Sequence, residues 1–311
     1  MKVLHHFDHS LRQYGIRHLA LGFFDGLHRG HHAVIVNEIT RDALDQTCVL
    51  TFWPHPMEVL SPDDQPVLLT NISDKTEILR SWGIGFICVV PFDTALAHQP
   101  YPEFLDSIQQ NFPALKSVSV GPNFRFGKQR GGTPLSLAEW CAERDLLFNL
   151  ADFMLDGSDP ISSTRIRALL EQGDLPAANR LLGRSYQISG TVIKGNQLGR
   201  KLGFPTANIS LDSPIHIPHG VYQVQVELAD QQQVCGALNH GLRPSVDGPA
   251  RETTEVHLID WAGDLYDQPV RCKLMRHIRP ETEFSTLDLL KDQIVRDIDA
   301  CRACEAGAAG A

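Results

Sequence analysis

The chain has 311 residues, of which 42% are hydrophobic and 21% charged, and its formal net charge is −9. This length predicts two domains, and the ordinary apolar content excludes a mostly disordered chain. No apolar run approaches the roughly 18–20 residues of a membrane span, and the N-terminus lacks the apolar region of a signal peptide. Both halves are acidic when the chain is divided after Gly183, which argues against a broad nucleic-acid surface. We therefore expect a cytoplasmic protein that binds neither nucleic acid nor membrane.

The cysteines show no spacing typical of a disulfide framework. Their odd number and their scatter along the chain predict reduced thiols, as in cytoplasmic proteins. Cys301 and Cys304 form one CxxC pair beside a short Ala/Gly-rich tail, but structural zinc sites usually need a second ligand pair. We expect two thiols on a fraying helix end rather than a zinc site.

The first part of the chain alternates strand-like and helix-like segments. Runs rich in Val, Ile, Leu and Phe predict strands that are buried on both faces of a sheet. These strands are expected at His18–Phe23, Cys48–Phe52, Phe86–Phe92, Ser117–Gly121 and Leu146–Phe153. The helices between them are expected at His31–Leu44, Asp74–Trp82, Glu103–Phe112 and Pro134–Arg144. Thr133 before Pro134 suits a helix N-terminus, and Asp74 with Glu77 resembles a capping box. Repeated strand–helix units predict a parallel α/β sheet.

The second part of the chain has a different pattern of predicted secondary structure. Two short helices, at Ser163–Gln172 and Leu175–Leu182, are predicted first, with Gly173 and Gly183 as their C-terminal caps. Strands separated by turn residues then follow at Tyr186–Lys194, Val221–Leu228, Gln233–Leu238, Thr253–Asp260 and Val270–His277. They predict an antiparallel β-barrel, followed by a terminal helix at Leu287–Cys301. We therefore expect one domain over residues 1–183 and a second over residues 184–311.

A glycine-rich stretch with two histidines follows the first predicted strand. Within the run Gly22–His31, glycines allow tight turns, and His28 and His31 flank Gly30 at the start of the next helix. Open α/β sheets bind ligands beyond the carboxyl ends of their strands, where a helix N-terminus attracts phosphate. Two imidazoles at that point can donate hydrogen bonds to phosphoryl oxygens. The alternative is a pair of ordinary surface histidines.

Three further segments carry groups that suit a nucleotide or a flavin. Pro54 and Pro56 stiffen a loop after the second strand and would brace a flat ring, although a rigid turn is the alternative. Asn123 follows another strand and offers both a donor and an acceptor, although turn asparagines are common. The run Ser163–Arg167 places hydroxyls and cations at one helix start, which suits a triphosphate. Alone, its arginines would be interpreted as a solvated helix face.

Together these segments resemble the adenylyltransferase module of bacterial bifunctional riboflavin kinase/FAD synthetases, which have a Rossmann-like HxGH nucleotidyltransferase domain. The runs that carry the resemblance are Gly22–His31, Thr51–Pro56, Gly121–Gly127 and Ile161–Arg167. The resemblance implies that the FMN phosphate attacks the α-phosphorus of ATP, with Mg²⁺ on the phosphates and pyrophosphate as leaving group. It implies catalytic roles for His28 and His31. The ATP-binding residues that it implies are Gly22, Phe24, Asp25, Asn123, Ser163, Thr164, Arg165 and Arg167, and the flavin-binding residues are Pro54, His55 and Pro56.

A second glycine-rich run, Gly190–Asn208, contains neither a Walker A loop nor a GxGxxG fingerprint. Thr206 and Asn208 lie two positions apart, so on extended chain they point the same way, and their side-chain oxygens suit Mg²⁺. Further along, Glu255 and His257 should share one face of a strand whose other face is in the core. Judged on residue types alone, Glu255 is more simply a solvent-facing acid. A barrel corner would explain any one of the glycines but not the whole run.

This second constellation resembles the riboflavin kinase module of the same enzymes. The matching runs are Gly190–Asn208, Gly220–Tyr222, Asn239–Pro244 and Glu255–Leu258. The resemblance implies Thr206 and Asn208 as Mg²⁺ ligands, Gly195 and Gly203 in the ATP site, Glu255 as general base and Arg279 as a flavin contact.

As a whole, the chain is therefore expected to convert riboflavin and ATP to FMN, and FMN and ATP to FAD. Two alternatives remain, a riboflavin kinase with an inactive N-terminal domain and a non-catalytic flavin-binding regulator. The oligomeric state is left open by the sequence.

Overall fold

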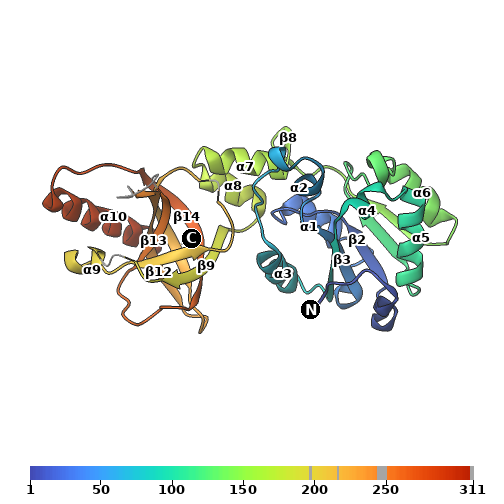
Figure 1. Ribbon diagram of the computed structural model, residues 1–311, viewed down its shortest axis with the longest axis horizontal. Coiled ribbons are helices and arrows are strands. Elements are labelled where there is room, and N and C mark those ends of the chain that lie inside the picture. Colours follow the sequence, from blue (N-terminus) through green and yellow to red (C-terminus); the bar gives the residue numbers. More distant parts are fainter. Residues whose placement is uncertain (196–197, 216, 244–250, 309–311) are drawn as a thin grey trace. The chain divides into compact units, whose positions relative to one another are not determined.

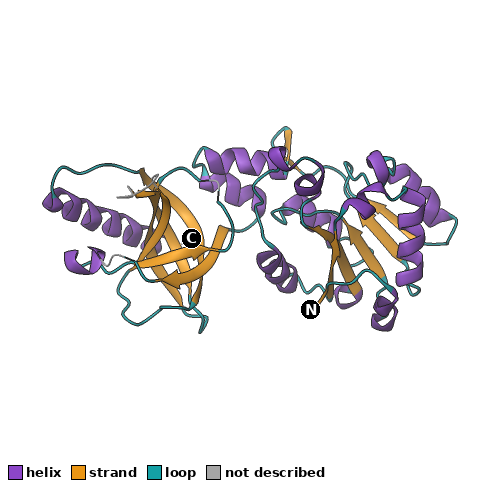
Figure 2. Ribbon diagram, viewed as in Figure 1, coloured by secondary structure: helices purple, strands orange, loops and turns teal. Residues whose placement is uncertain are grey.

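The computed structural model describes residues 1–195, 198–215, 217–243 and 251–308. The chain divides into two compact units, Met1–Ser163 and Thr164–Ala311. Figure 1 labels their elements, and Figure 2 shows a helix-flanked sheet in the first unit and a barrel in the second. Pro244, at the end of one of the matching runs, lies outside the described residues.

The first unit contains a six-stranded parallel sheet with the order β1-β4-β3-β2-β5-β6. Its strands are β1 Lys2–Leu4, β2 His18–Leu21, β3 Thr47–Trp53, β4 Phe86–Pro91, β5 Ser117–Val120 and β6 Leu147–Leu150. Its α-helices are α1 Arg29–Ile35, α2 Pro56–Leu60, α3 Ile72–Ser81, α4 Thr94–His98, α5 Tyr101–Asn111 and α6 Pro134–Ala142. Short 3-10 helices are η1 His9–Tyr14, η2 Leu44–Gln46, η3 Pro62–Asp64 and η4 Lys128–Arg130, and a small hairpin is formed by β7 Leu155–Asp156 and β8 Asp159–Pro160.

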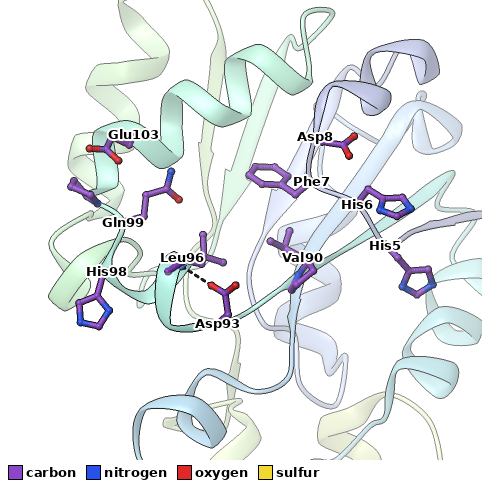
Figure 3. Close-up of a pocket in the computed structure, with 13 residues that line it drawn as sticks. His5, His6, Phe7, Asp8, Val90, Asp93, Leu96, His98, Gln99 and Glu103 are labelled. Carbon is purple, nitrogen blue, oxygen red and sulfur yellow. Dashed lines mark hydrogen bonds between the residues drawn. The ribbon is translucent and has the colours of Figure 1, made fainter.

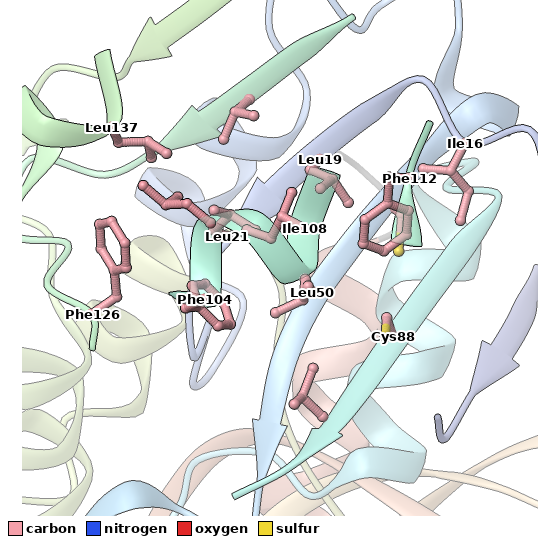
Figure 4. Packing of buried hydrophobic residues seen from close by; sticks show 14 of the residues in the cluster. Ile16, Leu19, Leu21, Leu50, Cys88, Phe104, Ile108, Phe112, Phe126 and Leu137 are labelled. Carbon is pink, nitrogen blue, oxygen red and sulfur yellow. The ribbon is translucent and has the colours of Figure 1, made fainter. Parts of the chain in front are cut away.

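Both faces of this sheet are covered by helices, because successive residues of a strand point to opposite sides. On one face, Leu19 and Leu50 belong to the same buried cluster as Phe104 of α5 (Figure 4). On the other face, Val49 packs in a cluster with Leu79 of α3. The parallel α/β fold predicted from the continuous apolar runs is therefore confirmed.

Several local details differ from the sequence-based expectation. The helix expected at His31–Leu44 ends at Ile35. Asn37 stops it, since its side-chain oxygen accepts the N–H of Ile39 at 2.9 Å and so offers the backbone an alternative to the helix. The capping box at Asp74 is wrong, because the side chain of Asn71 caps α3. β1 was not predicted at all.

The second unit contains α7 Ser163–Glu171, which begins on the last residue of the first unit, and three further helices, α8 Leu175–Leu182, α9 Leu198–Leu202 and α10 Leu287–Ala308. Its strands are β9 Tyr186–Ile193, β10 Ala207–Leu211, β11 Gly220–Glu227, β12 Gln233–Arg243, β13 Arg251–Leu258 and β14 Pro269–Pro280. They pair antiparallel into a closed barrel in the order β10-β13-β12-β11-β14-β9. The predicted barrel is confirmed, and β10, which the sequence analysis missed, is the strand that closes it.

The terminal helix α10 packs on the barrel through a small apolar cluster. Ile298 and Cys301 of α10 are buried there together with Ile259. The expectation of a fraying helix end is therefore wrong at Cys301, because its side chain is fully buried; the side chain of Cys304 lies outside the described part of the chain. Among the helices described, none has both the length and the apolar character needed to cross a membrane.

Candidate active sites

In the first unit, the residues predicted to bind substrates follow three neighbouring strands. The run Gly22–His31 follows β2, Thr51–Pro56 forms the end of β3 and its loop, and Asn123 follows β5. Because β3, β2 and β5 are adjacent and parallel, their carboxyl ends lie at one edge of the sheet. This edge is where open α/β sheets bind ligands.

The two predicted catalytic histidines form a stacked pair at the start of α1. Their ring centroids are 3.6 Å apart, and the ring planes are inclined by 18°. His28 is the N-cap of α1, and its Nδ1 accepts the N–H of His31 at 3.2 Å. The ring of Phe24 meets the His31 ring edge-on at 5.3 Å. The structure therefore fixes the orientation of the His28 ring through a backbone contact.

Glycines beside these rings leave room for them. A Cβ atom at Gly30 would lie 3.1 Å from the His28 ring, and one at Gly22 would lie 2.9 Å from the ring of Phe24. The loop between β2 and α1 also turns sharply, with a φ of +80° at Gly26. A side chain at either position 22 or position 30 would displace an aromatic ring next to the histidine pair.

The side chain of Asp25 anchors the loop between β2 and α1 to the segment before α3. Its side chain is buried, and its carboxylate accepts the N–H of Leu69 at 2.9 Å and of Thr70 at 3.2 Å. The hydroxyl of Ser163 donates to the Asp25 carbonyl at 2.9 Å, which joins the loop to the start of α7. The Asp25 carboxylate thus fixes the position of the loop that carries the histidines, and its role in binding ATP stays a prediction.

A buried lysine that the sequence analysis missed supports the same loop. Lys75 of α3 is 1% exposed, and its ammonium donates to the carbonyl of Phe23 at 2.6 Å and to Oγ1 of Thr51 at 3.3 Å. Burial lowers the pKa of Lys75 to about 8, and the negative charge of Asp25 opposes part of that shift. Lys75 lies on the inward stripe of α3, four residues before Leu79, but this position alone does not distinguish it from a solvated lysine.

Phe23 connects the histidine loop to the predicted flavin loop. The hydroxyl of Thr51 donates to the Phe23 carbonyl at 2.9 Å, and the ring of His55 lies edge-on to the Phe23 ring at 4.3 Å. His55 also caps α2, since its Nδ1 accepts the N–H of Met57 at 3.0 Å, and Pro56 opens that helix. Pro54 follows Trp53 through a cis peptide bond. The two segments that the sequence predicts to act together are therefore in contact.

The remaining candidates are divided between the two units. Asn123 is exposed just beyond β5, and Ser163 is half-buried at the first position of α7. Thr164, Arg165 and Arg167 follow directly in the first two turns of α7, which belong to the second unit.

A broad hollow of about 670 Å³ lies elsewhere in the first unit, beyond the ends of β1 and β4. Its walls include His5, Asp8, Val90, His98 and Glu103, and Figure 3 shows the hydrogen bond from the N–H of Leu96 to Asp93 beside it. None of the predicted site residues lines this hollow. The hollow is therefore not part of the proposed site.

In the barrel, the predicted kinase residues are brought together by strand pairing. Asn208 of β10 lies directly opposite Glu255 of β13, and the hydroxyl of Thr206 donates to Oε2 of Glu255 at 3.0 Å. Val256, next to Glu255, is buried in the barrel, so the predicted alternation of faces is confirmed. A hydroxyl, an amide and a carboxylate thus meet at one place.

Two glycines shape the segment around these groups. A Cβ atom at Gly195 would lie only 2.3 Å from Nδ2 of Asn208, so a larger residue there would displace the amide. Gly203 has a φ of +94°, a backbone conformation that glycine adopts without strain. The oxygen donors of Thr206, Asn208 and Glu255 form a set that suits Mg²⁺.

Arg279, the predicted flavin contact, is engaged by α10. Its guanidinium donates to both carboxylate oxygens of Asp297, with contacts of 2.9 to 3.1 Å. Gln293 donates to the same carboxylate at 2.9 Å. The bidentate geometry holds the guanidinium in one orientation and ties α10 to β14.

Comparisons with known proteins also relate the two parts of the chain to two different enzyme families. Residues 14–165 match the family model for FAD synthetase, and residues 182–305 match that for riboflavin kinase. The bifunctional riboflavin kinase/FMN adenylyltransferase of Escherichia coli K12 is 37% identical over 281 residues, 90% of each chain. The protein of that name from Haemophilus influenzae is 36% identical over 92% of this chain and 93% of its own. A solved structure from Streptococcus pneumoniae, described as a macrolide-efflux protein, covers 97% of this chain and 99% of its own at 27% identity, with a TM-score of 0.85.

Proposed function

This chain belongs to the family of bifunctional riboflavin kinase/FMN adenylyltransferases, and we propose here which of its residues carry the two reactions. The enzyme phosphorylates riboflavin with ATP to give FMN, and it adenylylates FMN with ATP to give FAD and pyrophosphate. The match of both family models to one chain favours this function over a riboflavin kinase with an inactive N-terminal domain. We propose that residues 1–183 form the adenylyltransferase domain and residues 184–311 the kinase domain.

In the adenylyltransferase, His28 and His31 stabilise the charge that develops on the phosphoryl oxygens of ATP. The FMN phosphate attacks the α-phosphorus directly, so the protein needs only to position the reactants and balance charge. Since Nδ1 of His28 accepts a backbone N–H, the neutral ring carries its proton on Nε2. His28 therefore donates from Nε2, in an orientation fixed by the start of α1.

For the adenylyltransferase reaction, the ATP-binding groups that we propose are Gly22, Phe24, Asp25, Asn123, Ser163, Thr164, Arg165 and Arg167. Asp25 would act through the loop that it holds, because its carboxylate is buried against backbone N–H groups. Pro54, His55 and Pro56 would bind the flavin ring of FMN. The contact between His55 and Phe23 supports this assignment, since it links the flavin loop to the loop that bears the histidines.

In the kinase, Glu255 takes the proton from the 5′-hydroxyl of riboflavin. The hydroxyl oxygen then attacks the γ-phosphorus of ATP, and ADP leaves. Thr206 and Asn208 would hold Mg²⁺, which neutralises phosphate charge when it is bound, and Gly195 and Gly203 would border the phosphates. The hydrogen bond from Thr206 orients the Glu255 carboxylate. Arg279 would contact the flavin while Asp297 fixes its orientation.

Single substitutions in the two sites test this assignment. Glu255→Gln should abolish FMN formation from riboflavin while FAD formation from supplied FMN continues, because the general base is lost and the other site is intact. His31→Ala should stop FAD formation and leave FMN formation nearly unchanged. Both activities are measured on the full chain by separating the flavins, with circular dichroism to confirm folding. If either folded variant loses both activities, the assignment of separate sites is wrong.

The setting of the enzyme is a further part of the proposal. Reduced thiols at scattered positions support a cytoplasmic location, where ATP is also available. The six cysteines whose side chains the structure describes form no disulfide. Its substrates are small molecules, and neither nucleic acid nor membrane is proposed as a partner.

A further inference from the structure

Three potential metal ligands converge where β11, β12 and β13 meet in the barrel. They are His219, directly before β11, His240 of β12 and Glu252 of β13, and their ligand atoms all lie within 4.8 Å of one another. Strand pairing brings them together, because Gly220 lies opposite His240 and Leu242 lies opposite Glu252. The grouping is therefore fixed by the register of three strands.

His240 is held in the orientation of a metal ligand. The residue is 2% exposed, and its Nδ1 lies 3.1 Å from Oγ1 of Thr254. When Nδ1 donates to that hydroxyl, the lone pair of the neutral ring is on Nε2. A hydrogen bond from the second ring nitrogen is the usual support of a metal-bound imidazole.

His219 and Glu252 have the spacing of two ligands on one ion. Nε2 of His219 lies 3.4 Å from Oε1 of Glu252. In a tetrahedral zinc site, bonds of about 2.0–2.1 Å place neighbouring ligand atoms about 3.3 Å apart. The simpler interpretation is a partly exposed ion pair, but that leaves the buried and oriented His240 beside it unexplained.

We propose that His219, His240 and Glu252 form a binding site for a divalent transition-metal ion of the zinc type, with the remaining coordination position open to water. Two imidazoles and one carboxylate suit such an ion, whereas Mg²⁺ prefers oxygen ligands. Glu252 does not share a face with the proposed general base, since Glu252 and Glu255 are three positions apart on β13 and therefore face opposite sides of the sheet. A bound ion would link β11, β12 and β13.

Zinc binding to the full chain tests the proposal without any substrate. The chain, freed of metal with a chelator, is titrated with Zn²⁺ in excess Mg²⁺, and bound zinc is measured after dialysis. All variants are made in a Cys304→Ser background, which removes the CxxC pair. The parent should bind one ion that Mg²⁺ does not displace, and its thermal unfolding temperature should rise with zinc. A Co²⁺ spectrum should show tetrahedral bands without thiolate charge transfer.

Matched variants decide whether these three residues are the ligands. His219→Ala and Glu252→Gln alter partly exposed side chains, so folding should survive, and each should weaken zinc affinity at least tenfold and remove the thermal shift. His98→Ala, on the surface of the first unit, should bind zinc like the parent. The proposal fails if His219→Ala and Glu252→Gln retain parent affinity, if the parent binds no zinc, or if Mg²⁺ displaces it.

Discussion

Replacing Gly195 with alanine is the sharpest test of the kinase site, because it disturbs one side chain through steric contact alone. The added Cβ atom would lie 2.3 Å from Nδ2 and 2.6 Å from Oδ1 of Asn208. Ordinary van der Waals contact begins near 3.4 Å, so the amide must retreat by about 1 Å. Asn208 stands on β10, paired with both β9 and β13, so its backbone has little freedom to follow.

A displacement of this size moves the Asn208 oxygen away from its proposed position as an Mg²⁺ ligand. Misplacing a positioning group by about 1 Å typically costs on the order of 10²-fold in rate. We therefore expect Gly195→Ala to lower kcat for FMN formation by about 10- to 100-fold. FAD formation from supplied FMN should stay within about twofold of the parent, because no residue of that site is touched.

The assay measures FMN and FAD formation separately, from riboflavin and from FMN, at saturating ATP and Mg²⁺. The control is Gly15→Ala, which also replaces a glycine with alanine, but no atom lies within 4 Å of the added methyl group. That variant has a φ of +60° at the substituted position and should lose about 1 kcal/mol of stability with both activities kept. A Gly195→Ala enzyme with parental kinase activity would refute the role of Asn208, provided that its fold is intact.

Three further predictions concern charge. The pKa of Lys75 in the folded protein is about 8, below its unfolded value, so the folded state holds fewer protons than the unfolded state between pH 8 and 10.5. The free energy of unfolding, compared with that of Lys75→Met, should therefore rise by about 2–3 kcal/mol from pH 7 to pH 10. Urea unfolding of the first unit measures this difference. An unchanged difference would mean that Lys75 titrates normally. Asp297→Asn should destabilise the barrel unit by about 3 kcal/mol in denaturant, because it leaves Arg279 uncompensated in a largely buried pair. Chelation of divalent metal should stop both activities and added Mg²⁺ should restore them; activity that survives chelation would contradict the assigned Mg²⁺ ligands.

Much of the fold was predictable because its signals are local. Continuous apolar runs marked four of the six strands of the parallel sheet within two residues at each end, and Gly173 and Gly183 do end α7 and α8 with positive φ. The expected cap at Thr133 is also present, with Ser136 completing a capping box. These features depend on residues next to one another in the chain, which is why the sequence alone indicates them.

The elements that were missed depend on distant partners. β10 has five residues and follows a glycine-rich segment, and it is a strand because β9 and β13 supply its hydrogen bonds. Lys75 is buried because Phe23, in the loop after β2, and Thr51 of β3 offer oxygens to its ammonium. Neither partner is within 20 residues of Lys75, so no local pattern separates it from a solvated lysine.

The structure explains the presence of glycine at two motif positions differently from the sequence analysis. The sequence analysis explained them by tight turns and close approach of the backbone to phosphate. The structure adds that Gly30 makes room for the ring of His28, and Gly195 for the amide of Asn208. In both sites a glycine therefore lets a polar side chain occupy a fixed position. A substitution at either glycine should then resemble loss of the neighbouring side chain, which links the steric test at Gly195 directly to the chemistry assigned to Asn208.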